Sequence, residues 1–219
     1  MKRWKQRLTL TNMLKISAAI AFIFLMLQTA VAAPVTILAL GDSLTAGLGL
    51  QPSDAFPVKL EAALRADGHD VTVVNAGVSG DTAVDGLARL DWALGDNVDA
   101  VIVELGANDA LRGLPPAQAE SALDGILTKL GERRLPVLLA GMRAPPNLGP
   151  DYQHAFDGMY QRLAEKHGTL FYPFFLNGVA AELSLNQADG MHPNPAGVDV
   201  IVSRIKPIVE QLIRKTAAK

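Results

Sequence analysis

Ser43 lies in the short segment Gly41-Asp42-Ser43-Leu44, which directly follows an apolar run in the chain. A serine at a tight turn between a strand and a helix exposes its hydroxyl and has outward-pointing backbone N–H groups beside it. Such a hydroxyl becomes a nucleophile only when a base takes its proton. The chemistry therefore depends on whether a histidine can reach Ser43.

The chain has four histidines, and three of them have the surroundings of solvated surface groups. His69 lies in a predicted turn before a strand, and His154 and His167 lie on a predicted helix rich in charged residues. His192 differs, because it lies in a turn-forming segment before the last predicted helix, three residues after Asp189. That spacing lets the carboxylate fold back and fix the imidazole tautomer, as the third member of a catalytic triad does. The spacing alone fits equally well a turn that Asp189 merely caps, with His192 on the surface.

Elements able to position these residues follow from Val35 onward, where short apolar runs alternate with amphipathic stretches. This alternation predicts a parallel sheet covered by helices. The predicted strands are Val35–Leu40, Val71–Asn75, Ala100–Leu105, Val137–Gly141 and Thr169–Tyr172. The predicted helices are Ala55–Ala66, Val84–Leu94, Ala117–Leu130, Tyr152–His167 and Pro195–Ile213. The predicted fold is a three-layer α/β/α sandwich with a mainly parallel five-stranded sheet, in one domain spanning residues 33–219.

Two of the predicted helices begin after residues suited to capping. Ser53 or Asp54 precedes the helix at Ala55, and Asn194 precedes Pro195. Side chains of these types accept a hydrogen bond from the first free backbone N–H groups of a helix, and proline suits the first helical position. Both starts are therefore expected at these residues.

Small and polar residues follow four of the predicted strands. Ligands of open parallel sheets bind beyond the carboxyl ends of the strands, so these segments predict one shared site. The segments are Gly41–Leu44, Ala76–Asp81, Gly106–Asp109 and Met142–Pro145. The polar, proline-rich passage over residues 143–151 is interpreted as a loop that lines this site.

Four sequence blocks together resemble those of the GDSL or SGNH hydrolases, which have a flavodoxin-like fold. They occur in the family's order and span nearly all of the chain after residue 33. The blocks are Gly41-Asp42-Ser43-Leu44, Ser79-Gly80-Asp81-Thr82, Gly106-Ala107-Asn108-Asp109 and Asp189-Gly190-Met191-His192-Pro193. Within the family, the likeness is to its bacterial periplasmic thioesterase, lysophospholipase and arylesterase members.

The resemblance implies that Ser43 is the nucleophile, His192 its base and Asp189 the residue that orients the base. It also implies an oxyanion hole formed by the Ser43 and Gly80 backbone N–H groups and the Asn108 side chain. Glycine at position 80 leaves no Cβ in the way of a substrate, and an asparagine amide can hold a fixed donor toward a developing oxyanion. By itself, Asn108 would fit an ordinary turn residue as well. Ala107 stands where related enzymes often have glycine, so the shape of that loop is left open.

The acyl pocket is expected between two loops, residues 111–117 and 143–151, with Leu111, Arg143 and Pro145 as substrate-binding residues. Both loops could instead be plain connections. The implied substrates are small aryl or alkyl esters, acyl thioesters and lysophospholipids, and no metal or cofactor is expected. Acyl preference and oligomeric state are not encoded in any motif.

Several other functions fit the sequence less well. Neither Ser43 nor Ser79 lies in the Gly-x-Ser-x-Gly pattern of a nucleophile elbow, because Thr45 and Asp81 occupy the final positions. The Gly47-Leu48-Gly49 segment lacks the third glycine of a dinucleotide-binding loop. One histidine beside scattered carboxylates is poor material for zinc, and the chain has no cysteine. An exported, non-catalytic module that binds a small ligand at the same edge remains the alternative.

The first 32 residues have the pattern of a secretory signal peptide. A basic start precedes an apolar stretch, Ile16 to Leu27, and Ala30-Val31-Ala32 offers a small-x-small cleavage site. An uncleaved anchor is the alternative, but the stretch is shorter than the roughly 20 residues of a spanning helix. We therefore expect cleavage after Ala32 and an exported, periplasmic or secreted protein without stable membrane insertion.

Removal of this leader makes the chain acidic. Five of the 20 Lys and Arg residues lie within residues 1–32, so 15 remain against 22 Asp and Glu, a formal charge of −7. Nucleic-acid-binding proteins present a basic face, and anionic lipid attracts basic segments. The charge therefore argues against both as partners.

Overall fold

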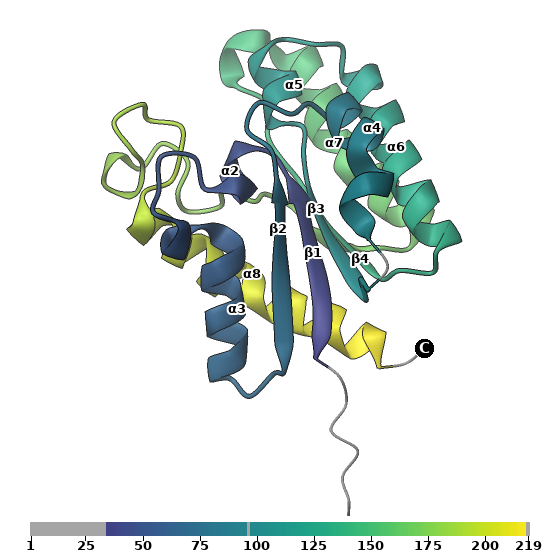
Figure 1. The fold of residues 1–219 in the computed structure, drawn as a ribbon. Coiled ribbons are helices and arrows are strands. Elements are labelled where there is room, and N and C mark those ends of the chain that lie inside the picture. Colours follow the sequence, from purple (N-terminus) through teal and green to yellow (C-terminus); the bar gives the residue numbers. More distant parts are fainter. Residues whose placement is uncertain (1–33, 96, 218–219) are drawn as a thin grey trace, which may run out of the picture. The chain divides into compact units, whose positions relative to one another are not determined.

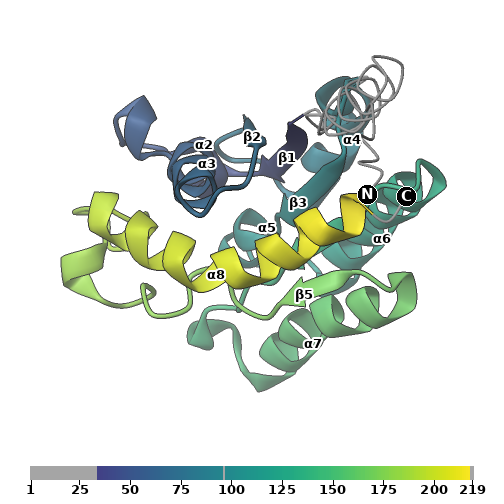
Figure 2. The same ribbon diagram turned by 90° about the horizontal axis from the view of Figure 1, so that it is seen from below.

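Five parallel strands form the centre of the protein, which is described by a computed structural model over residues 34–95 and 97–217. They pair in the order β2-β1-β3-β4-β5, and every pairing is parallel (Figures 1 and 2). The strands are β1 (Val35–Gly41), β2 (Val71–Gly77), β3 (Ala100–Glu104), β4 (Val137–Ala140) and β5 (Leu170–Tyr172). This confirms the predicted α/β fold and its five-stranded sheet, and each predicted strand agrees to within about two residues.

Five longer helices cover the two faces of the sheet. One face carries α3 and α8, and the other carries α4, α6 and α7, as Figures 1 and 2 show. The helices are α3 (Phe56–Ala66), α4 (Ala83–Leu94), α6 (Pro116–Glu132), α7 (Pro150–His167) and α8 (Pro195–Thr216). The three predicted layers are therefore present. Short helices that the apolar pattern did not predict, α2 (Ser43–Ala46) and α5 (Ala107–Leu111), begin directly after β1 and β3.

Burial differs between the centre and the edges of the sheet. All five residues of β3 are buried, as expected for a strand covered on both faces. β2 and β5 are only partly buried, because each has a neighbouring strand on one side alone. Burial along the whole strand is therefore found in β3 and β4 and not at the edges of the sheet.

One of the two predicted helix caps is present. Asn194 caps α8, because its Oδ1 accepts a hydrogen bond from the Gly197 N–H at 3.0 Å. The prediction for α3 is wrong: Ser53 and Asp54 lie in a preceding 3₁₀ helix, and the cap position is Ala55, which makes no side-chain bond. Pro57 in the first turn lacks an N–H, so fewer donors there need a cap.

The strand order places a crevice where β1 and β3 end. Connections from these neighbouring strands leave toward opposite faces of the sheet, and ligands of such sheets bind at this switch point. Ser43 follows β1 and Asn108 follows β3, so the topology brings two of the predicted site residues to one place.

The predicted signal peptide, residues 1–32, lies outside the described residues. Within the part of the chain that the structure does describe, no helix is both long and apolar enough to cross a membrane.

Candidate active site

Ser43 is the first residue of α2, at a sharp turn from β1. The buried Asp42 caps this short helix, since its Oδ1 accepts a hydrogen bond from the Leu44 N–H at 2.9 Å. Gly47, with φ of +82°, ends the helix in a left-handed conformation. The backbone of Ser43 is thus held in a short helix that is capped at both ends.

The structure brings Ser43, His192 and Asp189 together in one hydrogen-bonded chain. Ser43 Oγ lies 2.9 Å from His192 Nε2, and His192 Nδ1 lies 2.6 Å from Asp189 Oδ2. With a proton on Nδ1 donated to the carboxylate, Nε2 is free to accept the serine proton. This order of contacts is the one that general-base activation of a serine requires.

Asp189 is held by the backbone of the residues it orients. Its Oδ1 accepts hydrogen bonds from the N–H groups of His192 at 3.0 Å and Met191 at 2.9 Å. These two backbone bonds, with the bond to the imidazole, lower the pKa of Asp189 to about 2. The carboxylate therefore stays ionised well into the acidic range and can accept a hydrogen bond from His192 Nδ1 there.

The loop carrying Asp189 and His192 is closed at its base. Asn186 and Pro193 form an antiparallel bridge, and the Gln187 N–H donates to the His192 carbonyl at 2.7 Å. The Gln187 side chain donates to the Leu48 carbonyl at 2.7 Å, just beyond the serine helix. One side chain therefore joins the histidine loop to the segment that carries the nucleophile.

Asn108 lies on α5 and faces the serine helix. Its Nδ2 donates to the Asp81 carbonyl at 3.0 Å and to Asp42 Oδ2 at 3.2 Å. Both amide N–H bonds thus have acceptors, and an oxyanion at this position would have to share or replace the longer bond, to Asp42. The amide bridges the segments that follow β1 and β2.

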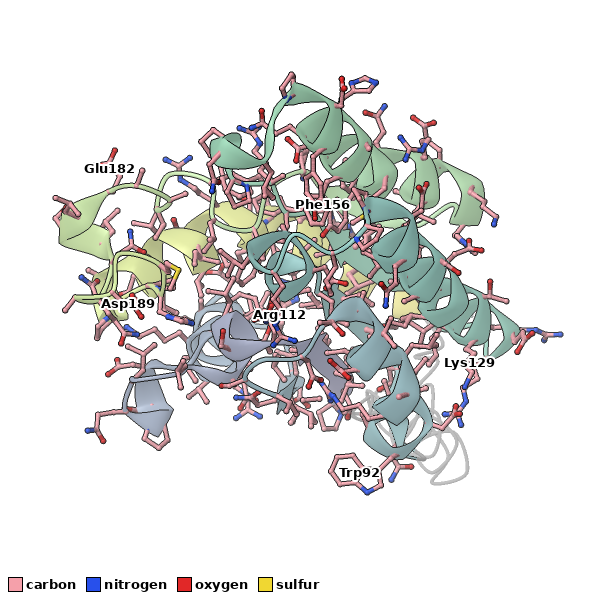
Figure 3. All side chains as sticks on the ribbon, turned by 90° about the horizontal axis from the view of Figure 1, so that it is seen from above. Trp92, Arg112, Lys129, Phe156, Glu182 and Asp189 are labelled. Atoms are coloured by element: carbon pink, nitrogen blue, oxygen red, sulfur yellow. The ribbon has the colours of Figure 1, made fainter. Side chains whose placement is uncertain are left out.

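Gly80 lies in the turn after β2 with φ of +92°, a backbone conformation that residues other than glycine rarely adopt. Its carbonyl accepts a hydrogen bond from Arg112 Nη2 at 2.7 Å, whereas among the described residues its N–H has no acceptor. Figure 3, which looks onto the edge where the strands end, shows Arg112 and Asp189 on this side of the protein. Glycine is thus required at position 80 by the backbone conformation of the turn, and it also leaves the N–H uncovered by a side chain.

A pair of buried carboxyl groups lies beneath the serine turn. Glu104 ends β3 directly opposite Gly41, and its Oε2 accepts a hydrogen bond from Thr45 Oγ1 at 2.7 Å. Burial, with repulsion from Asp42, raises the pKa of Glu104 well above its usual range. Burial likewise raises the pKa of Asp42 to about 6, against the lowering effect of the Leu44 N–H. A side chain at Gly41 would collide with Glu104 and Thr45, so that glycine makes room for the carboxyl group.

A cavity of about 410 Å³ opens beside the Ser43 hydroxyl. Leu111, Arg143 and Pro145, the predicted substrate-binding residues, all line it, and the Arg143 guanidinium lies 4.9 Å from the Phe174 ring centre. Gly80 is not among its described lining residues, and of the predicted loop over residues 111–117 only Leu111 reaches it. The wall is mostly apolar, which suits an acyl or aryl group.

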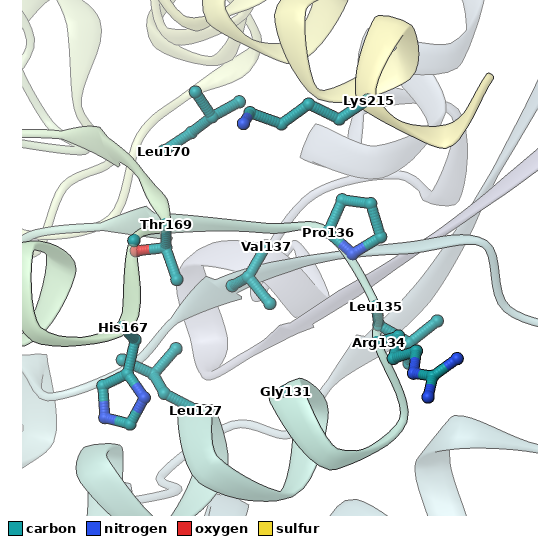
Figure 4. Close-up of a pocket in the computed structure, with 11 residues that line it drawn as sticks. Leu127, Gly131, Arg134, Leu135, Pro136, Val137, His167, Thr169, Leu170 and Lys215 are labelled. Carbon is teal, nitrogen blue, oxygen red and sulfur yellow. The ribbon is translucent and has the colours of Figure 1, made fainter. Parts of the chain in front are cut away.

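A second cavity, of about 430 Å³, lies at the opposite ends of β4 and β5 (Figure 4). It is lined by His167, which was expected on the surface but is partly buried, with Nε2 2.6 Å from Asp124 Oδ1. The two cavities have nearly equal volumes, so size does not show which one is the candidate active site. Their lining residues do, because the first cavity is lined by Ser43 and His192. Among the described residues, no group of three or more His, Asp or Glu side chains could hold a metal ion.

Several residues at the site were not predicted from the sequence. The cavity is also lined by Phe174, Leu176, Ala180 and Ala181, which belong to a segment that no prediction placed at the site. Glu104 carried a signal, because a carboxylate in an otherwise apolar strand is rarely buried without a role. The lining residues carried none, since apolar side chains in loops have no characteristic spacing.

Comparison with known proteins identifies the family of the chain. The model of the GDSL-like lipase/acylhydrolase family matches residues 39–200. The esterase TesA of Pseudomonas aeruginosa is 41% identical over 190 residues, which are 86% of this chain and 94% of that protein. Thioesterase 1/protease 1/lysophospholipase L1 of Escherichia coli K12 is 39% identical over 194 residues, 86% of this chain and 92% of that protein.

A solved structure shares both sequence and fold with the chain. AlinE4, an esterase of the SGNH-hydrolase family, is 49% identical with a TM-score of 0.71, covering 83% of this chain and 98% of its own. The family match spans most of the chain and includes the Ser43, Gly80, Asn108 and His192 segments. The chain therefore belongs to the GDSL-like lipase/acylhydrolase family and is a serine esterase.

Proposed function

We propose that the protein hydrolyses carboxylic esters through an acyl-enzyme on Ser43, with His192 as general base and Asp189 as its orienting partner. The observation that carries the proposal is the hydrogen-bonded chain of these three side chains, 2.9 and 2.6 Å in length, beside the 410 Å³ cavity. A non-catalytic binding module would have no need of this alignment, and membership in an esterase family favours catalysis.

In acylation, Ser43 Oγ attacks the ester carbonyl carbon while its proton passes to His192 Nε2. The carbonyl oxygen becomes an oxyanion, which the backbone N–H groups of Ser43 and Gly80 and the Asn108 amide stabilise. The tetrahedral intermediate collapses when the imidazolium gives its proton to the departing alkoxide or thiolate. The ionised Asp189 stabilises the imidazolium during both transfers.

In deacylation, a water molecule takes the place of the leaving group beside His192. The imidazole removes a proton from this water, which attacks the acyl carbon and forms a second oxyanion in the same site. Return of the proton to Ser43 Oγ releases the carboxylic acid. Both halves of the reaction thus use the same three side chains.

We expect the substrates to be small aryl and alkyl esters, acyl thioesters and lysophospholipids. Its apolar wall binds an acyl chain, whereas its 410 Å³ volume limits the length of chain that can be enclosed. Each buried methylene contributes about 0.8 kcal/mol, or roughly fourfold in kcat/KM. We expect kcat/KM to rise by this factor per methylene in a nitrophenyl ester series and then to level off.

A fluorophosphonate probe tests the proposal directly. Such probes react with activated serines, so the purified protein should be labelled on Ser43, and Ser43→Ala should be neither labelled nor active. Labelling of another serine, or turnover by Ser43→Ala, would overturn the assignment. Parallel nitrophenyl ester and acyl thioester series would then rank the substrate classes.

We propose further that the protein is exported to the periplasm or secreted, after cleavage of its leader behind Ala32. The leader's basic start, apolar stretch and small-x-small site support this location. Mass spectrometry of the exported protein should find Ala33 at its amino terminus. An intact Met1, or retention in membranes after an alkaline wash, would contradict cleavage.

A further inference from the structure

Arg89 on α4 reaches two segments of the proposed site from beneath. Its guanidinium forms an ion pair with Asp81 through Nε, and its Nη2 donates to the Gly41 carbonyl at 2.9 Å. Gly41 ends β1 two residues before Ser43, and Asp81 directly follows Gly80. The Arg89 side chain is mostly buried, with 17% of its surface exposed.

The contacts of Arg89 continue to each proposed oxyanion donor. The Gly41 carbonyl also accepts the Val78 N–H at 3.0 Å, which ties the turn before Gly80 to the end of β1. The Asp81 carbonyl accepts Asn108 Nδ2 at 3.0 Å. The guanidinium therefore fixes the spacing between the segments that carry the Ser43 N–H, the Gly80 N–H and the Asn108 amide.

We propose that Arg89 is a positioning residue for the oxyanion hole, an inference that rests on the function proposed above for Ser43, Gly80 and Asn108. A planar guanidinium presents donors in a rigid fork, so it can hold a carboxylate and a carbonyl at a fixed separation. Lysine has a single point charge on a flexible stem and cannot do this. Arg89 itself lines no part of the cavity, so it acts on the reaction only through these segments.

The expected effect of losing Arg89 falls on the transition state. Oxyanion donors bind more strongly as the carbonyl gains charge, so their misplacement lowers kcat and leaves KM nearly unchanged. A shift of about 1 Å at a reacting centre can cost about a hundredfold. We expect Arg89→Ala to lower kcat by roughly tenfold to a hundredfold.

The experiment compares Arg89→Ala and Arg89→Lys with the wild type on one nitrophenyl ester. Each kcat is divided by the fraction of protein that a fluorophosphonate finally labels, so unfolded molecules do not count. Arg89→Lys keeps the charge facing Asp81, and it should fold normally yet still lose kcat. The rate of labelling should fall with kcat, because the probe also forms a tetrahedral oxyanion. Guanidinium, below concentrations that change the melting temperature, should restore part of the kcat of Arg89→Ala.

Arg65, a half-exposed arginine with the same kinds of partner, supplies a control at the opposite end of the sheet. Its Nε donates to the Val71 carbonyl at 2.8 Å, and its Nη2 pairs with Glu61 at 3.1 Å, so it also holds a carbonyl and a carboxylate. Arg65→Ala should lower the melting temperature without changing kcat per labelled site. A purely structural Arg89 would behave in the same way.

The inference is overturned if both Arg89 variants keep kcat per labelled site within about twofold of the wild type, or if their losses appear mainly in KM. An equal kcat loss in Arg65→Ala would also overturn it, since the effect would then be general. Failure of the underlying function has a different signature, because Ser43→Ala would then remain active. The two ideas can thus fail separately.

Discussion

The Ser43 hydroxyl and the His192 imidazole lie 2.9 Å apart, although 149 residues separate them in the chain. The serine leaves the central strand β1, whereas the histidine lies in a loop before α8. Gln187 joins the two segments through the Leu48 carbonyl. The alignment of nucleophile and base therefore depends on a bridged loop as well as on the sheet.

Replacing either member of this pair should remove activity. Ser43→Ala and His192→Ala should each lower kcat by a factor on the order of 10⁶, because residues that act as one unit show similar, non-additive losses. Steady-state kinetics on a nitrophenyl ester measure this. His154→Ala is the matched control. His154 is exposed on α7, so this variant should hydrolyse the ester at the wild-type rate. A crippled His154 variant would mean that the base is wrongly assigned.

Asp189→Asn should keep the fold and lose most of the activity. The asparagine amide can donate to Nδ1, which stabilises the tautomer with its proton on Nε2, where the serine needs an acceptor. The same change in another Ser-His-Asp enzyme costs about 10⁴-fold in kcat, and a comparable fall is expected here. Backbone N–H groups hold the pKa of Asp189 at about 2. Its titration should therefore leave no inflection above pH 4 when kcat of the wild type is plotted against pH. Titration of the Asp189 carboxyl itself above pH 4, followed by NMR in the wild type, would contradict this.

The buried carboxyl pair predicts how stability changes with pH. A carboxyl group whose pKa is raised by folding stabilises the native state below its unfolded pKa, and this stabilisation is lost as pH rises through the folded value. For Asp42 the loss falls between about pH 3.8 and 6, and for Glu104 it continues to higher pH. Melting temperatures across this range should therefore fall with rising pH where these two groups dominate.

Glu104→Gln isolates the part of that decline due to Glu104. The amide is uncharged at every pH and can still accept from Thr45 Oγ1, so the variant should lose less stability above pH 6 and keep most of its kcat. Glu104→Ala loses the contact as well and leaves a cavity, so it should melt lower at all pH values. A Glu104→Gln variant with the same pH dependence as the wild type would show that Glu104 is ionised in the folded protein.

The sequence predicted the sheet, its main helices and the convergence of the blocks, for definable reasons. Strands such as Val101-Ile102-Val103 are buried on both faces, so the apolar run itself reveals them. The site segments could be placed because chain connectivity fixes the carboxyl ends of parallel strands on one edge. The short helices α2 and α5 were not predicted, because four or five residues are too few to show a helical period.

Other features depend on three-dimensional contacts that no local pattern contains. His167 has the sequence surroundings of a surface residue, yet Asp124 on α6 pairs with it across the packed helices. Arg89 and Gly41 are 48 residues apart, and nothing in either segment indicates their contact. The contacts of Asn108 are of the same kind: the resemblance implied an oxyanion donor, but only the structure shows that its amide donates to the Asp81 carbonyl and Asp42.

Asn108 offers the sharpest test of the mechanism, because its amide should act on the transition state and hardly at all on the bound ester. In the free protein its N–H bonds are taken by the Asp81 carbonyl and Asp42, so the oxyanion must compete for the longer bond to Asp42. Giving up that bond costs free energy, so the exchange is favourable only for the fully charged oxyanion and not for the planar ester. Asn108→Ala should lower kcat by about a hundredfold to a thousandfold and move KM little.

Asn108→Asp is a harsher change of nearly the same size. It replaces the N–H donor with a carboxylate that would face the oxyanion, Asp42 and the Asp81 carbonyl at once. We expect it to be at least as inactive as Asn108→Ala, with slower fluorophosphonate labelling of Ser43 in both. Repulsion between the two carboxylates should also raise the pKa of Asp42 above its wild-type value of about 6, so the Asp variant should begin to regain stability at a higher pH than the wild type as pH falls. A near-normal kcat in either variant, or a loss confined to KM, would make Asn108 a turn or binding residue instead of an oxyanion donor.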